Sequence, residues 1–120
     1  MADILIADDS DAIRLVLKEI LSIGEHNVVA EATDGNEAVE FFQKHKPHLL
    51  MTDLAMPNKD GIQVVKDVIA IDPNAKIILI TATDDKNLIQ QCLDAGASSV
   101  VAKPFDFKSV LKTISEVIEN

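Results

Sequence analysis

The chain has little or none of several residue types that cross-link or target a protein. It contains one cysteine, four phenylalanines and no tryptophan or tyrosine among 120 residues. Because the single Cys92 cannot form a disulfide within the chain, we expect a reducing compartment. The sequence has no apolar run of the roughly 18 residues that a membrane helix needs, and no basic N-terminal region typical of a signal peptide. These absences predict a cytoplasmic protein with no membrane partner.

Positive charge is scarce as well. Eleven Lys and Arg residues stand against 20 Asp and Glu, which gives a net charge of −9. Contacts to nucleic-acid phosphates need clustered basic side chains, so this balance argues against direct binding of nucleic acid. Aliphatic residues, in contrast, are abundant, and 48% of the chain is hydrophobic. One domain of this length buries about two thirds of its unfolded surface and needs no disulfide or structural metal to fold.

Short apolar runs alternate with helical patterns five times along the chain. The predicted strands are Ile4–Ala7, Val28–Ala32, His48–Thr52, Lys76–Ile80 and Ser99–Ala102. These runs are continuous, as in parallel strands that helices cover on both faces. Strict alternation of strand and helix in one short domain predicts an α/β fold with a doubly wound, five-stranded parallel sheet.

Helical spacing and capping residues mark the segments between the strands. The first segment has an apolar stripe of Ile13, Val16, Leu17, Ile20 and Leu21, and the last has one of Phe107, Val110, Leu111, Ile114, Val117 and Ile118. Residues that can cap a helix N-terminus are Ser10 or Asp11, Asp60, Asp84 and Asp106. Gly24 and Gly96 predict helix ends, and we interpret Asp34 as a loop residue.

Polar side chains gather where four of the predicted strands end, and in such a sheet those ends form one edge. In chain order they are Asp8 and Asp9, Asp53, Thr81, and Lys103. Two carboxylates about 5 Å apart repel by roughly 3 kcal/mol at an effective dielectric near 20. Lys103 alone supplies too little positive charge to keep three acids ionised. A set of oxygen ligands without His or Cys therefore predicts Mg²⁺ or a similar hard ion.

A carboxylate beside Mg²⁺, Lys and Thr is suited to phosphoryl transfer. The transferring group spreads negative charge over three equatorial oxygens, and catalysis consists mainly of positioning and neutralising them. A carboxylate can also act as the nucleophile and form an acyl phosphate. We predict Asp53 as this phosphoacceptor, because it ends the central strand and the backbone after it turns towards Pro57.

Five segments, in this order, resemble the receiver domain of two-component response regulators. They are ADDS (7–10), MTDLAMPNKDG (51–61), ILITA (78–82), DAGAS (94–98) and VAKPF (101–105). The similarity spans the whole chain, so residues 1–120 are expected to form one receiver domain, similar above all to the stand-alone chemotaxis type. The resemblance implies a flavodoxin-like fold with strand order 2-1-3-4-5.

The resemblance also implies a role for each residue of the polar set. Asp53 is the implied acceptor of a phosphoryl group from a histidine kinase or a small acyl phosphate. The implied ligands of the Mg²⁺ cofactor are Asp8, Asp9, Asp53 and the backbone carbonyl of Ala55. Thr81 and Lys103 are implied to bind phosphoryl oxygens. Such a chain catalyses only its own phosphorylation and dephosphorylation and is not otherwise an enzyme. The Lys103–Pro104 bond is cis in many relatives.

In this family phosphorylation moves Thr81 together with a residue three positions before the lysine. That position is usually aromatic and is Val100 here, whose single stiff torsion prevents the same swing. The implied output is a shifted two-state equilibrium that changes the affinity of one face for a downstream protein. This face comprises the fourth helix, the fifth strand and the fifth helix. The chain is expected to be a monomer or a phosphorylation-dependent dimer.

Other functions remain open from the sequence. A phosphorelay intermediate would pass its phosphoryl group on to a second histidine. A Mg²⁺-dependent phosphohydrolase also uses an Asp nucleophile, but the chain lacks a second acid spaced for acid–base work and a cap domain. A flavodoxin-like cofactor binder is disfavoured because the acidic loop at residues 8–11 would repel a phosphate. Cys92 and the three histidines are expected to pack or cap rather than to react.

Overall fold

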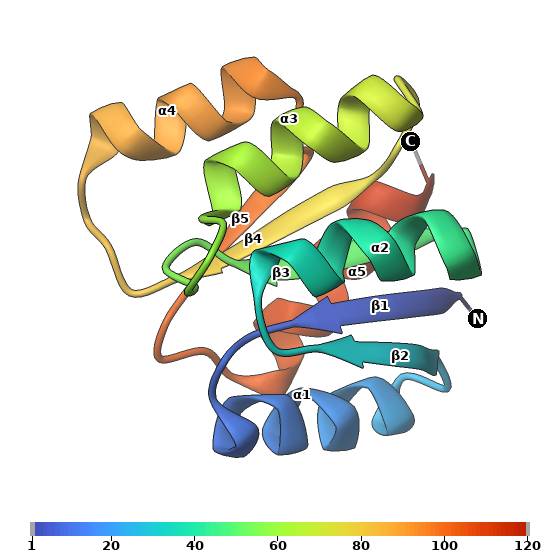
Figure 1. Cartoon of the computed structure of the whole chain (residues 1–120). Helices are drawn as coiled ribbons and strands as arrows, with labels where there is room; N and C mark the ends of the chain where they lie inside the picture. Colours follow the sequence, from blue (N-terminus) through green and yellow to red (C-terminus); the bar gives the residue numbers. More distant parts are fainter. Residues whose placement is uncertain (1, 120) are drawn as a thin grey trace.

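The computed structural model describes residues 2–119 as one parallel sheet between two layers of helices (Figure 1). The strands are β1 (Asp3–Ala7), β2 (Asn27–Ala32), β3 (Leu49–Asp53), β4 (Ile77–Thr81) and β5 (Ser99–Ala102). The helices are α1 (Asp11–Ile23), α2 (Gly35–His45), α3 (Gly61–Ile71), α4 (Lys86–Ala95) and α5 (Phe107–Glu119). The strand order β2-β1-β3-β4-β5 confirms the doubly wound α/β fold. Over these residues no helix combines the length and apolarity that crossing a membrane requires.

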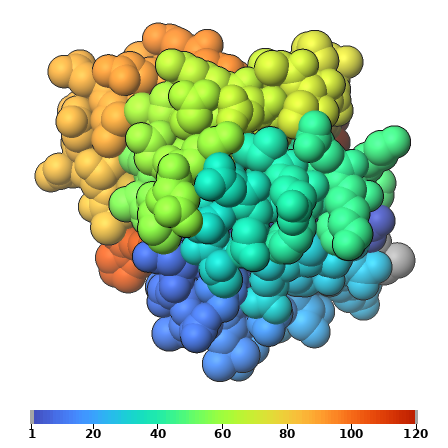
Figure 2. Space-filling view, viewed as in Figure 1, coloured from blue at the N-terminus to red at the C-terminus, as the bar shows by residue number. Residues whose placement is uncertain are grey.

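Each face of the sheet carries its own hydrophobic core. On one face α1 and α5 pack against the sheet through Leu17, Leu21, Val110 and Ile114. On the other face lie α2, α3 and α4, and the space-filling view shows how these helices cover the sheet (Figure 2). Because both faces are covered, every residue of β3 and β4 is buried. Burial on both faces explains why these strands are continuous apolar runs in the sequence.

Strands β3 and β4 each begin and end one residue later than predicted. Asp53 pairs with Ile80, and Thr81 pairs with Ala102, so both polar residues belong to the sheet instead of following it. Each of these residues lies opposite a residue of the neighbouring parallel strand, so the pairing of the sheet includes it. As a result, the backbones of Asp53 and Thr81 are held by the sheet, and their side chains start from fixed positions at its carboxyl edge.

The helix caps agree with the sequence at three helices and differ at two. The predicted caps that accept a backbone N–H of their helix are Ser10, Asp60 and Asp106. The prediction of Asp84 was wrong, because Asp85 caps α4 and accepts two backbone N–H groups at 3.0 and 3.2 Å. Asp34 is more than a loop residue, since it caps α2 by accepting the N–H of Glu37. The predicted C-terminal glycines, Gly24 and Gly96, end α1 and α4.

Two members of the predicted apolar stripes lie at the surface. Val16 is 43% exposed and Phe107 is 45% exposed. In α1 the buried positions are Arg14, Leu17, Ile20 and Leu21. Arg14 thus lies on the buried face of the helix, where its side chain finds polar partners at the end of the sheet. Val16 lies on the exposed face. Cys92 is fully buried, as the packing interpretation requires.

Candidate functional site

Three carboxylates meet at the carboxyl edge of the sheet. One oxygen each from Asp8, Asp9 and Asp53 lies within 4.8 Å of the others. Asp8 is 1% exposed and Asp53 is 7% exposed, whereas Asp9 faces solvent. At such a separation two ionised carboxylates repel by roughly 3 kcal/mol at an effective dielectric near 20. Three hard oxygen donors around one point suit Mg²⁺, so the residues present fit the ion that the sequence predicts.

Lys103 supplies the positive charge within this cluster. Its Nζ lies 3.2 Å from Asp8 Oδ2 and 3.5 Å from Asp53 Oδ1. Burial raises the pKa of Asp53, and the charge of Asp8 raises it further, while Lys103 lowers it. The balance of these effects is a raised pKa, so one ammonium does not compensate for the two acids and their burial.

The backbone after β3 returns sharply past Asp53. The N–H of Leu54 donates to Asp53 Oδ1 at 2.8 Å, and the N–H of Gly61 donates to the carbonyl of Leu54 at 2.7 Å. A Cβ at position 61 would lie 2.8 Å from the carbonyl oxygen of Asp53, so only glycine allows this close approach of α3. The loop between these residues therefore starts and ends against the backbone of the strand.

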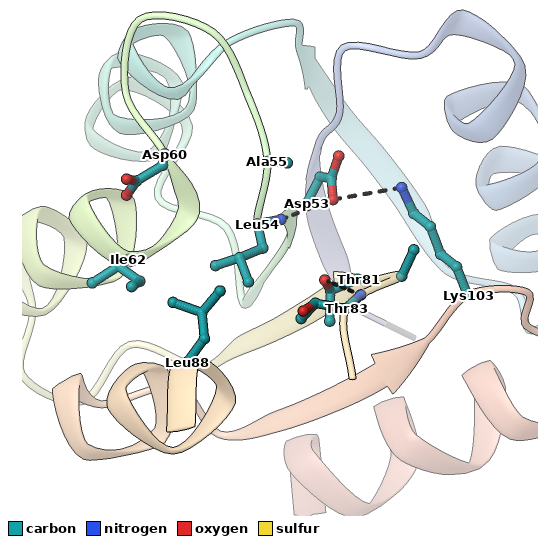
Figure 3. Close-up of a pocket in the computed structure, with 10 residues that line it drawn as sticks. Asp53, Leu54, Ala55, Asp60, Ile62, Thr81, Thr83, Leu88 and Lys103 are labelled. Atoms are coloured by element: carbon teal, nitrogen blue, oxygen red, sulfur yellow. Dashed lines mark hydrogen bonds and ion pairs between the residues drawn. The ribbon is translucent and has the colours of Figure 1, made fainter. Parts of the chain in front are cut away.

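An open pocket of 490 Å³ lies beside Asp53 (Figure 3). Its polar lining comprises Asp53, Asp60, Thr81, Thr83 and Lys103, and its apolar lining comprises Leu54, Ala55, Ala82, Ile62 and Leu88. The dashed lines in Figure 3 join Asp53 to Leu54 and Lys103, and the N–H of Thr83 to Thr81 Oγ1, at 3.1 Å. The predicted residues Ala55 and Thr81 thus share one cavity with Asp53 and Lys103.

Val100 is not one of the residues that line this cavity. It is half-buried in β5 and packs against the core on the side of α2, α3 and α4. Its neighbour in the sheet is Leu79, two residues before Thr81. The Lys103–Pro104 peptide bond is cis, as in the relatives considered above.

The sequence did not reveal the side chains that hold the loops around the acids. Arg14 is 8% exposed, and its Nη1 donates to the carbonyl of Asp8 at 2.6 Å. On the loop after β3, Asn58 donates from its side chain to Asp34 at 2.8 Å, across 24 residues of sequence. A basic residue among apolar ones at helical spacing was the available signal for Arg14. No comparable signal points to the contact between Asn58 and Asp34.

Comparison with known proteins decides the family. Residues 4–115 match the family described as response regulator receiver domain. The chain belongs to this family. This receiver domain is 37% identical over 114 residues to the chemotaxis protein CheY of Thermotoga maritima, covering 95% of each chain. It is also 33% identical over 118 residues to protein CcdB of Bacillus subtilis, covering 98% of each.

Solved structures agree with this assignment. The receiver domain has a TM-score of 0.93 and 32% identity to a chain in the CheX–CheY–BeF3–Mg complex from Borrelia burgdorferi, covering 96% of this chain and 87% of that one. It has a TM-score of 0.94 and 29% identity to the receiver domain of the putative response regulator NarL from Mycobacterium tuberculosis, covering 99% and 97%. Both comparisons match the fold described above, and they associate it with two-component signalling.

Proposed function

We propose that this receiver domain is a phosphorylation-activated response regulator that accepts a phosphoryl group on Asp53. The convergence of three carboxylates within 4.8 Å carries the proposal, since it combines an acceptor with a site for a divalent cation. The proposed ligands of Mg²⁺ are the side chains of Asp8, Asp9 and Asp53 and the backbone carbonyl of Ala55. Bound Mg²⁺ would neutralise the acids and the oxygens of the incoming phosphoryl group.

The transfer requires an in-line approach to Asp53. A carboxylate oxygen of Asp53 forms a bond to phosphorus while the bond from phosphorus to the leaving group breaks. The leaving group is the nitrogen of a phosphohistidine on a kinase, or the carboxylate of acetyl phosphate. Lys103 has the position to pair with one phosphoryl oxygen, because its Nζ is already 3.5 Å from Asp53 Oδ1. The hydroxyl of Thr81, in the same cavity, would bind another.

The output that we propose is altered binding of a downstream protein to the face formed by α4, β5 and α5. Phe107, at the start of α5, is the one large apolar side chain exposed on these three elements within residues 2–119, at 45%. One relative was solved in a CheX–CheY complex, which supports a protein as the partner. Thr81 and Val100 would link phosphorylation to this face, through β4 and β5. Because valine cannot swing like an aromatic side chain, we expect the loop before α4 to carry most of the movement.

The test is labelling by acetyl phosphate in the presence of Mg²⁺, followed by intact-mass measurement. We expect one phosphoryl group per chain in the parent and none in Asp53→Asn. Asp60→Asn is the matched control: it removes a carboxylate from the same cavity, where Asp60 caps α3, and it should still be labelled. Labelling of Asp53→Asn to the level of the parent would refute the proposal. Continuous turnover of a phosphate ester, without stoichiometric labelling, would instead indicate a phosphohydrolase.

A further inference from the structure

A buried guanidinium lies directly behind the acidic cluster and has no part in the chemistry described so far. Arg14, in the first turns of α1, makes three polar contacts. Its Nη1 donates to the carbonyl oxygen of Asp8 at 2.6 Å, its Nε donates to Glu31 Oε1 at 3.1 Å, and its Nη2 pairs with Asp11. From the geometry we infer that Arg14 is a positioning residue for the metal ligands, and this inference rests on the function proposed above.

The contact with Asp8 acts on the peptide that joins two proposed ligands. The carbonyl of Asp8 and the N–H of Asp9 belong to the same rigid plane, so holding one fixes the direction in which the chain leaves towards the other. The other side of Asp8 is also fixed, because its N–H donates to the carbonyl of Ala32 at 3.0 Å. Arg14 therefore completes the restraint of this backbone on the side of Asp9.

Asp9 depends on that restraint more than its neighbours do. Among residues 2–119 its side chain has no hydrogen-bond or ion-pair partner, and it is exposed. Asp8, in contrast, is held through its own carboxylate, which accepts from the N–H of Ser10 at 2.8 Å and from Lys103 at 3.2 Å. The position of the Asp9 carboxylate is thus set through its backbone, which is held on one side by the contact of Arg14 with the Asp8 carbonyl and on the other by the bond from the N–H of Ser10 to Asp8.

The guanidinium is itself held in place by a second strand. Glu31, on β2, accepts from Arg14 through one carboxylate oxygen and from Lys18 through the other, both at 3.1 Å. Arg14 needs this partner because an unpaired buried charge is costly. The planar guanidinium group has several N–H donors in fixed directions, so it can bind a carboxylate and a backbone carbonyl at the same time. A lysine ammonium cannot bind both in the same geometry.

Positioning and simple charge predict opposite effects on the affinity for Mg²⁺. If Arg14 acted only through its charge, Arg14→Met would remove a cation near the site and would strengthen Mg²⁺ binding. If Arg14 orients the ligands, the same substitution weakens binding. Supporting contacts to metal ligands are worth about 10-fold or more in affinity. Arg14→Lys retains the positive charge but lacks the guanidinium group. If Arg14 orients the ligands, this variant should therefore also bind Mg²⁺ more weakly.

The experiment is a titration of the full chain with MgCl₂ at constant ionic strength, followed by ¹H–¹⁵N chemical shifts, which also report whether each variant is folded. We expect dissociation constants at least about 10-fold higher than the parent in Arg14→Met and in Arg14→Lys. Lys18→Met is the matched control: it removes a positive partner of the same Glu31 without touching Asp8, and its constant should equal the parent's or be lower. If Arg14→Met does not fold, the Arg14→Lys result decides.

Labelling by acetyl phosphate supplies a second readout. The Mg²⁺ concentration for half-maximal labelling should rise in both Arg14 variants, while the rate at saturating Mg²⁺ stays near that of the parent. Binding at the parent's affinity or tighter, in either folded variant, would overturn the inference while leaving the proposed function intact. Absence of Mg²⁺ binding and of Asp53 labelling in the parent itself would overturn both.

Discussion

The two edges of the sheet carry polar side chains that are paired in different ways. At the amino edge several of them bond to neutral groups: His26 and His48 accept the N–H groups of Ala2 and Asp3 at 3.1 and 2.9 Å, and the side chain of Asn27 donates to Asp3 at 3.3 Å. Lys76 at the same edge donates to the carbonyl of Ile118 at 2.9 Å. At the carboxyl edge, by contrast, like charges face one another within 4.8 Å.

This difference separates a structural edge from a functional one. Hydrogen bonds between a side chain and a neutral backbone group stabilise the fold whether or not a ligand is present. Carboxylates that repel one another cost stability until a cation binds them. The raised pKa of Asp53, caused first by burial and then by Asp8, is the sign of that cost. The comparison predicts that substitutions at the carboxyl edge respond to Mg²⁺ and those at the amino edge do not.

The largest expected effect is at Lys103. In EDTA, Lys103→Met should lower the free energy of unfolding by about 3 kcal/mol, because it leaves buried acids without their cation. Millimolar Mg²⁺ should restore part of this loss. Urea unfolding followed by circular dichroism measures both values.

Lys76→Met is the control at the other edge. It removes an ammonium at the end of the sheet opposite the acids, where donation to a backbone carbonyl is one of its contacts, so its cost should be the same with and without Mg²⁺. If Lys103→Met unfolds like the parent in EDTA, or if Mg²⁺ rescues both variants equally, the contrast between the edges is invalid.

A smaller effect is expected from Mg²⁺ on the parent protein. At a concentration ten times its dissociation constant, a ligand that binds only the folded state adds about 1.4 kcal/mol of stability. For a chain of this size we expect the melting temperature to rise by about 5 °C. Asp9→Asn should abolish the rise, and in EDTA its melting temperature should equal that of the parent or exceed it, since the substitution removes one of the repelling charges at an exposed position. If Mg²⁺ raised the melting temperature of Asp9→Asn as much as that of the parent, the ion would bind at a site that does not include Asp9.

The fold and the acids of the site could be predicted from sequence because both depend on local order. Continuous apolar runs alternating with helical spacing specify a covered parallel sheet, and such a sheet brings strand ends to one edge. Asp8, Asp9, Asp53, Thr81 and Lys103 were found in this way. The predicted ends of β3 and β4 were wrong by one residue, because the backbone pairing of Asp53 and Thr81 depends on the neighbouring strand.

The contacts that the sequence did not reveal include pairs far apart along the chain. Arg14 meets Glu31 17 residues away, and Asn58 meets Asp34 24 residues away. Within its own helix Arg14 resembles a solvent-facing residue that interrupts an apolar stripe, and only the position of β2 makes it a buried one. Such contacts follow from loop conformation and strand order, which periodicity does not determine.

The smallest effect is expected at the amino edge and concerns pH. Burial lowers the pKa of His26. The unfolded chain therefore binds a proton more readily than the folded one, so the contribution of His26 to stability is complete above about pH 6.5 and is lost as pH falls through the lowered pKa. In His26→Gln a side-chain oxygen can accept the N–H of Ala2 at any pH. We expect the stability of the parent relative to the variant to fall by up to about 1 kcal/mol between pH 7.5 and pH 5 in urea unfolding, with or without Mg²⁺. A difference that is constant over this range, or that appears only with Mg²⁺, would show that the amino edge is not the neutral structural end that its hydrogen bonds indicate.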